Sequence, residues 1–159
     1  MVKLLVIDLQ RQFKDGNEDK YNECLGYVKS NMTSYDNIVS TLFRQNDGNK
    51  NFEECLDYTL CKETSIQDLE YYGENFSGNV IVKNGYGIPR IEDFLNKEDT
   101  IDIVGCCSEA CVLAICFQLW DLGIKFRVLS KYIFTSSKNS KISDSVLEVL
   151  KSNFGDCIQ

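Results

Sequence analysis

The sequence predicts a doubly wound α/β domain with three layers (α/β/α) built around a mostly parallel sheet of five or six strands. Short apolar runs rich in β-branched residues alternate with longer segments of helical period almost from end to end, which is typical of βαβ units. The chain has 159 residues and shows no linker or internal repeat. We therefore expect residues 1–159 to form one domain.

Five segments are predicted to be strands because each is almost continuously apolar, as a parallel strand covered on both faces should be. They span residues 3–8, 37–43, 79–83, 100–105 and 125–130. Helices are predicted at 19–33, 91–95, 108–122 and 143–152 from the helical spacing of apolar residues or from residues typical of helix ends. In the third helix Ser108 can act as the cap and Gly123 can end it. The irregular stretch 44–77 should hold one or two short helices.

Charge and cysteine content exclude several classes of function. The net charge is −7 and the basic residues are scattered, so we expect no nucleic-acid partner and no membrane partner. The N-terminal apolar run between Lys3 and Asp8 is too short for a signal peptide or a membrane span, which favours a cytoplasmic location. The eight cysteines include no C-x-x-C pair. We expect free thiols and no structural zinc site.

Three residues that can carry chemistry follow strands of the predicted sheet. Asp8 ends the first strand, Lys83 ends the third, and Cys111 follows the fourth. Because ligands of open α/β sheets bind at the carboxyl ends of the strands, the three side chains should share one edge. With a strand order of 2-1-3-4-5, the strands that carry them would be neighbours.

A cysteine in that position can act without histidine, which the chain lacks. Cys111 lies in the first turn of the predicted 108–122 helix, where the helix dipole and a nearby Lys83 ammonium favour a thiolate. Asp8 could accept the thiol proton and return it to a leaving amine. These residue types predict a cysteine nucleophile with a carboxylate as its base.

Three motifs are similar to those of the isochorismatase-like cysteine hydrolases, a family that includes nicotinamidases, N-carbamoylsarcosine amidase and ureido or biuret-type amidohydrolases. They are "VIDLQRQF" (6–13), "VKNGYG" (82–87) and "IVGCCSEACVLAICFQLWDLGIKFRVL" (103–129), in the order and spacing of the family. Residues 35–58 also resemble the second-strand region of a compact branch. The resemblance spans nearly the whole chain and implies an isochorismatase-like, Rossmann-like fold.

The resemblance also implies roles for individual residues. Asp8 would be the general base and acid, Lys83 its electrostatic partner, and Cys111 the nucleophile. A non-proline cis peptide bond would join Cys106 and Cys107, and the backbone N–H groups of Cys107 and Cys111 would form the oxyanion hole. The side chains of Cys106 and Cys107 are by default small buried hydrophobes.

Substrate contacts are implied on either side of the catalytic residues. By the resemblance, Gln10 and Phe13 line the substrate cleft, although a structural role explains them nearly as well, with Gln10 in a polar turn and Phe13 in the core. Tyr86 is a candidate substrate contact because it is close to Lys83 in the sequence. Ser108-Glu109 stands where the family commonly has Thr-Asp. Nicotinamidases hold a metal with an Asp and two histidines, so the absence of histidine disfavours that activity and predicts no catalytic metal and no cofactor.

The leading hypothesis is an enzyme that hydrolyses a C–N bond of a small amide, carbamoyl or ureido substrate through a thioester at Cys111. The alternatives are hydrolysis of a vinyl ether, as in isochorismatase, and a binding protein without turnover on the same fold. A redox pair among Cys106, Cys107 and Cys111 ranks last because their spacing lacks the C-x-x-C geometry. The partner is a small molecule, and relatives imply a homo-oligomer, either a dimer or a tetramer.

Overall fold

The computed structural model describes residues 1–46, 48–73, 75–137 and 140–159. Its centre is a five-stranded sheet in which every strand pairs in parallel with its neighbours, in the order β3-β2-β1-β4-β5. The strands are β1 (Val2–Ile7), β2 (Asn37–Phe43), β3 (Gly78–Lys83), β4 (Thr100–Cys106) and β5 (Lys125–Phe134). This arrangement confirms the predicted doubly wound α/β fold.

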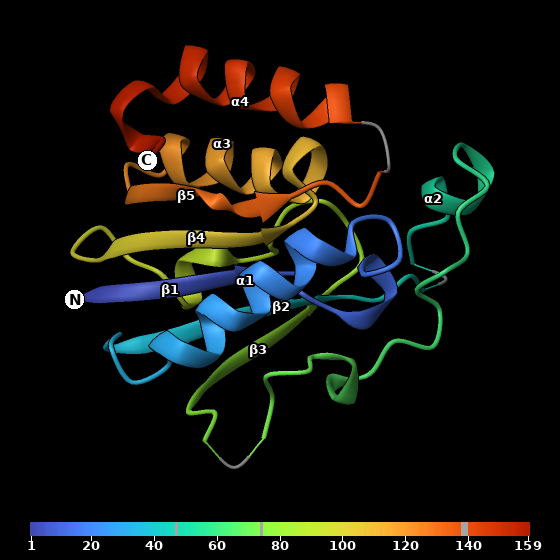
Figure 1. The fold of residues 1–159 in the computed structure, drawn as a ribbon, viewed down its shortest axis with the longest axis horizontal. Helices are drawn as coiled ribbons and strands as arrows, with labels where there is room; N and C mark the ends of the chain where they lie inside the picture. The colour runs from blue at the N-terminus through green and yellow to red at the C-terminus, as the bar shows by residue number, and fades with distance from the viewer. Residues whose placement is uncertain (47, 74, 138–139) are drawn as a thin grey trace.

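Helices flank the sheet on both faces, and in Figure 1 α1 lies in front of the strands while α3 and α4 lie together beside β5. The α-helices are α1 (Glu18–Asn31), α2 (Asn51–Glu54), α3 (Leu113–Asp121) and α4 (Ser140–Phe154). Single helical turns occur at η1 (Arg11–Phe13), η2 (Ile66–Asp68), η3 (Ile91–Asp93), η4 (Ser108–Val112) and η5 (Gly155–Cys157). No helix in the described ranges is long and apolar enough to cross a membrane.

The alternation of side chains along β1 builds two cores, one on each face of the sheet. Leu4 and Val6 pack with α1 and with buried residues of the 44–77 stretch. Leu5 and Ile7 pack on the opposite face with α3, α4 and the segment around η3. Because β1 is buried on both faces from Leu4 to Ile7, this run has no polar residues that alternate with the apolar ones.

The predicted elements agree with the structure to within a few residues, with two corrections. The predicted helix at 108–122 is divided into a wide π-helical turn, η4, and α3. Ser108 is not its cap: Cys107 occupies that position, and its side chain makes no capping hydrogen bond. Gly123 ends α3 as expected, with φ of +67°.

The strand order is the second correction. The order 2-1-3-4-5 is wrong, because β3 lies at the sheet edge beyond β2 and is not beside β1. The pattern of β3 agrees with an edge position, since Gly78, Asn79 and Val82 are exposed. The topological switch point therefore lies between β1 and β4, and the loops after these two strands diverge to opposite faces of the sheet there.

Gly105 fixes the approach of β4 to β1 just before the candidate site. Its φ is +119°, and a Cβ atom at this position would lie 2.1 Å from the backbone oxygen of Ile7. Only glycine combines this backbone conformation with so close a contact. The loop that begins at Cys106 is thus anchored against the end of β1.

We expect Gly105→Ala to lower the free energy of unfolding by at least about 2 kcal/mol, because it adds backbone strain and a clash with Ile7. The matched control is Gly26→Ala in α1, where no atom lies within 4 Å of the added Cβ; it should stabilise by about 0.5–1 kcal/mol. Urea unfolding of both proteins measures the difference. Equal stability of the two variants would contradict this account.

Candidate active site

Asp8, Lys83 and Cys111 meet in the structure although they lie far apart in the sequence. The Lys83 Nζ atom lies 2.7 Å from Asp8 Oδ2 and donates a hydrogen bond of 3.3 Å to Cys111 Sγ. The side chains of Asp8 and Lys83 have no exposed surface, and Cys111 is 6% exposed. A carboxylate, an ammonium and a sulfur thus form one contiguous cluster.

Lys83 reaches Asp8 across an intervening strand. It ends β3 and pairs in register with Phe43 of β2, and its ammonium lies 5.3 Å from the centre of the Phe43 ring. The same ammonium donates a hydrogen bond of 2.8 Å to the backbone oxygen of Gly85. The length of the lysine side chain therefore compensates for a strand order that separates β3 from β1.

Thr41 of β2 holds the carboxyl group of Asp8 in place. Its hydroxyl donates to Asp8 Oδ1 at 2.6 Å and accepts from the Asp8 backbone N–H at 3.0 Å. Asp8 itself has φ of +43°, in the left-handed region that non-glycine residues rarely adopt. The two contacts with Thr41 fix this conformation, a role that no motif in the sequence indicated.

The loop after β4 presents Cys111 to this cluster. The peptide bond between Cys106 and Cys107 is cis, and the Cys107 oxygen accepts hydrogen bonds from the N–H groups of Ala110 and Val112, both at 3.1 Å. The wide turn η4 that follows carries Cys111. Turns of this type are frequent at functional sites because they change the direction in which a side chain points.

The protonation of Cys111 differs from the sequence-based expectation. Burial, and after it the Asp8 carboxylate, raises the pKa of the Cys111 thiol well above its ordinary value, and Lys83 offsets this only in part. Burial and the Asp8 carboxylate therefore oppose the predicted thiolate. Burial also disfavours the Lys83 ammonium, but the Asp8 carboxylate and then Cys111 outweigh burial and raise the pKa of Lys83. Asp8 and Lys83 form an ion pair, and the surroundings of Cys111 favour its protonated form.

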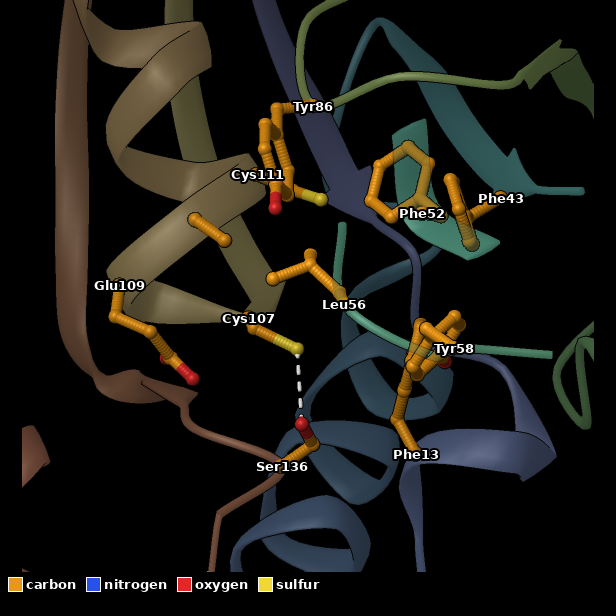
Figure 2. A pocket seen from close by; sticks show the side chains of 11 residues that line it. Phe13, Phe43, Phe52, Leu56, Tyr58, Tyr86, Cys107, Glu109, Cys111 and Ser136 are labelled. Atoms are coloured by element: carbon orange, nitrogen blue, oxygen red, sulfur yellow. Dashed lines mark hydrogen bonds between the residues drawn. The ribbon is translucent and has the colours of Figure 1, made fainter. Parts of the chain in front are cut away.

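A cavity of about 180 Å³ opens next to Cys111, and in Figure 2 the sulfurs of Cys107 and Cys111 lie opposite the rings of Phe43, Phe52 and Tyr58. The apolar wall consists of Phe13, Phe43, Phe52, Leu56, Tyr58 and Tyr86. The opposite wall consists of Cys107, Glu109, Ala110, Cys111 and Ser136. This volume suits a compact ligand, since pockets for drug-sized molecules start at roughly 300 Å³.

The three candidate substrate contacts have different positions. Phe13 and Tyr86 line the cavity, whereas Gln10 is not among its lining residues. The Gln10 side chain is fully buried and bonds both backbone groups of Phe43, accepting from its N–H at 2.8 Å and donating to its oxygen at 3.1 Å. Gln10 therefore ties the loop after β1 to the end of β2.

Several cavity residues were not found from the sequence. Phe52, Leu56 and Tyr58 come from the 44–77 stretch. The sequence around them is partly apolar, but its apolar residues follow no clear helical or strand period that would indicate a cavity wall. Glu109 was noted only as a departure from the family motif. Its carboxylate accepts hydrogen bonds from Thr135 at 2.7 Å and from Ser108 at 3.2 Å. It places a negative charge on the cavity wall.

Within the described ranges, no group of three or more cysteine, aspartate or glutamate side chains is arranged to hold a metal ion. The eight cysteines are all free thiols.

No family model matches the sequence, and no curated protein matches it significantly. Solved structures do match. A pyrazinamidase/nicotinamidase from Streptococcus mutans is 15% identical, with 100% of both chains covered and a TM-score of 0.73. An isochorismatase-like hydrolase from Alkaliphilus metalliredigens is 13% identical, with 95% of this chain and 91% of the other covered and a TM-score of 0.71.

The chain has the isochorismatase-like hydrolase fold. A nicotinamidase from Staphylococcus aureus shares it at 20% identity, with 99% and 96% of the two chains covered and a TM-score of 0.67. At these identities the likeness is one of fold, and the activity has to be argued from the residues of the site.

We expect Asp8→Asn to shift the alkylation of Cys111 by iodoacetamide to lower pH, by about one unit or more. The wild-type profile should rise only above the ordinary thiol range, because burial and the Asp8 carboxylate favour the protonated form. Removing that carboxylate leaves Lys83 to favour the thiolate. Alkylation is followed by peptide mass spectrometry.

The exposed Cys55 serves as the internal reference for this experiment. Asp144→Asn, on the exposed surface of α4, is the matched control and should leave the Cys111 profile unchanged. If Asp8→Asn and Asp144→Asn gave the same profile, the coupling between Asp8 and Cys111 would be wrong.

Proposed function

We propose that this protein is a cysteine-dependent hydrolase that cleaves the C–N bond of a small amide through a thioester at Cys111. The observation that carries the proposal is the contact of Lys83 with both Asp8 Oδ2 and Cys111 Sγ at the edge of a cavity. The fold supports it, since the neighbours include proteins described as nicotinamidases and isochorismatase-like hydrolases.

The chemistry follows from the protonation of the cluster. Because burial and the Asp8 carboxylate favour the protonated form of Cys111, we assign the thiol proton to the Asp8 carboxylate as the sulfur attacks the substrate carbonyl carbon. Lys83 remains charged and balances the negative charge that moves from Asp8 to the sulfur and then to the substrate oxygen. A high thiol pKa therefore does not prevent attack when base and nucleophile are in contact.

The oxygen of the tetrahedral intermediate needs donors, and by the resemblance these are the backbone N–H groups of Cys107 and Cys111. Each such donor contributes about 2.7–4 kcal/mol in characterised hydrolases. When the C–N bond breaks, Asp8 returns the proton to the leaving nitrogen. Water then attacks the thioester, its proton passes to Asp8 and on to the sulfur, and the acid leaves.

The cavity wall narrows the substrate class. Six side chains supply apolar surface, Glu109 supplies a negative charge, and no lysine or arginine of the described residues lines the cavity. The neighbouring Lys83 is already paired with Asp8. Compact neutral amides fit this wall, whereas carboxylate-bearing ureido acids would meet Glu109 without a compensating cation. The same argument disfavours an anionic vinyl ether such as isochorismate.

We expect Cys111→Ala to reduce ammonia release from a panel of small neutral amides at least about 10³-fold, because it removes the sulfur that contacts Lys83 of the Asp8–Lys83 pair. Cys157→Ala, which removes a half-buried thiol at the C-terminal end of the chain, is the matched control and should retain activity. Intact-mass spectrometry of rapidly acidified samples should detect the acyl adduct only when Cys111 is present. Undiminished activity in Cys111→Ala would remove the covalent mechanism, and no turnover of any amide would favour a binding protein.

Glu109→Gln should weaken the preference for neutral over anionic substrates about tenfold, because the substitution removes the charge next to the bound molecule. The preference is measured as the ratio of kcat/KM for an amide and for its carboxylate-bearing analogue of similar size. Glu148→Gln, on the exposed face of α4, controls for net charge. If both variants kept the wild-type ratio, Glu109 would have no part in selection.

A further inference from the structure

We propose that Cys107 and Cys106 form an oxidant-sensitive thiol pair, in which Cys107 reacts with hydroperoxides and Cys106 resolves the product to a disulfide. The Cys106 thiol donates a hydrogen bond to Cys107 Sγ at a sulfur-to-sulfur distance of 2.9 Å. A disulfide bond is about 2.05 Å long, so the two sulfurs have to approach by less than an ångström. Neither side chain takes part in the proposed hydrolysis.

The surroundings of the two sulfurs differ as this chemistry requires. Cys107 is 9% exposed and lines the cavity, where a small oxidant can reach it, whereas Cys106 has no exposed surface. A hydrogen bond also joins Cys107 Sγ to Ser136 Oγ at 3.2 Å, the dashed line in Figure 2. Reactive thiols that act as oxidant sensors have this combination of access and an adjacent resolving cysteine.

Protonation favours Cys107 as the attacking sulfur. The hydrogen bond from Cys106 lowers the pKa of Cys107; burial opposes this effect, and Ser136 assists it. Burial and the contact with Cys107 raise the pKa of Cys106 well above its ordinary value, so Cys106 keeps its proton. Because the pKa of Cys111 is raised too, Cys107 is the more reactive thiol of the cavity toward a hydroperoxide.

The reaction balances in two steps. The Cys107 thiolate attacks the O–O bond of a hydroperoxide, an S–OH group forms, and the second oxygen leaves as water or an alcohol after taking up a proton. The Cys106 sulfur then attacks the Cys107 sulfur, the S–O bond breaks, and the hydroxide leaves as water with the Cys106 proton. Two thiols are oxidised and one hydroperoxide is reduced.

The resulting disulfide should be easy to reduce. Consecutive Cα atoms are about 2.9 Å apart across a cis peptide bond and about 3.8 Å apart across a trans one, and both distances are shorter than the roughly 4.4–6.8 Å that ordinary disulfides span. A ring closed between adjacent residues is therefore strained, and strained disulfides are the labile ones. A disulfide has no S–H group, so closure also removes the hydrogen bond that Cys107 donates to Ser136 on the cavity wall.

The test is a titration of the whole protein with hydrogen peroxide at neutral pH, read by intact-mass and peptide mass spectrometry. The wild-type protein should lose about 2 Da, in the peptide that contains both cysteines, and dithiothreitol should restore the mass. Cys106→Ser should instead accumulate sulfinic acid at Cys107, a gain of about 32 Da. Cys107→Ser should show neither change in that peptide.

Phenylarsine oxide gives a second measurement that uses only the wild-type protein. This arsenical bridges two closely spaced thiols, so one equivalent should bind and should protect Cys106 and Cys107 together from alkylation. Oxidation that occurs first at Cys55, Cys111 or Cys157, with Cys106 and Cys107 still reduced, would overturn the proposal. A loss of about 2 Da that persists in Cys106→Ser would also overturn it, because another cysteine would then be the partner. None of these readouts requires turnover, so the outcome is separate from that of the proposed hydrolase activity.

Discussion

The buried ion pair between Asp8 and Lys83 is the contact on which the rest of the site depends. Both side chains are completely removed from solvent, and loss of one partner from a pair of this kind typically costs about 3–5 kcal/mol because the other charge stays buried. Thr41 donates a further hydrogen bond to Asp8 Oδ1, and Lys83 donates to the Gly85 oxygen and to Cys111 Sγ. The pair joins the end of β1 to the end of β3 across β2, so the geometry of the candidate site and the packing of the sheet edge depend on the same contact.

The sequence predicted the elements of this fold and the meeting of Asp8, Lys83 and Cys111 at one edge, because buried parallel strands have a strong local signature and all their carboxyl ends face the same way. The strand order could not be predicted in this way. A short apolar pattern such as that of residues 79–83 fits a strand beside β1 as well as a strand at the sheet edge. Which position it takes depends on how the connection that contains Ile88 and Ile91 packs against the far face of the sheet. The lysine reaches Asp8 because its side chain is long enough to cross one strand.

Properties that depend on tertiary packing could not be predicted from the sequence. Phe52, Leu56 and Tyr58 form a wall only after the irregular 44–77 stretch folds back over the end of β2. The state of Cys111 was misjudged for a related reason, since helix dipole and neighbouring lysine can be inferred from sequence but burial cannot. Burial of a thiol beside a carboxylate outweighs one ammonium in contact with it, and the thiol keeps its proton.

The cavity is therefore lined by two cysteines, Cys107 and Cys111, whose pKa values are shifted in opposite directions. They are four residues apart in the loop after β4. Cys111 keeps a proton that Asp8 can accept only when a carbonyl carbon is in place to receive the sulfur, so its reactivity depends on a bound substrate. The hydrogen bond from Cys106 lowers the pKa of Cys107 against the effect of burial, and Ser136 assists it, with no substrate present. A freely diffusing oxidant therefore meets Cys107 as the available nucleophile. The hydrogen bond from Cys106 lowers the pKa of Cys107 and also holds the Cys106 sulfur next to it. This one contact therefore supports both steps of the proposed oxidation, the attack by Cys107 and the resolution by Cys106, whose own pKa is raised. Cys111, the nucleophile proposed for hydrolysis, takes no part in it.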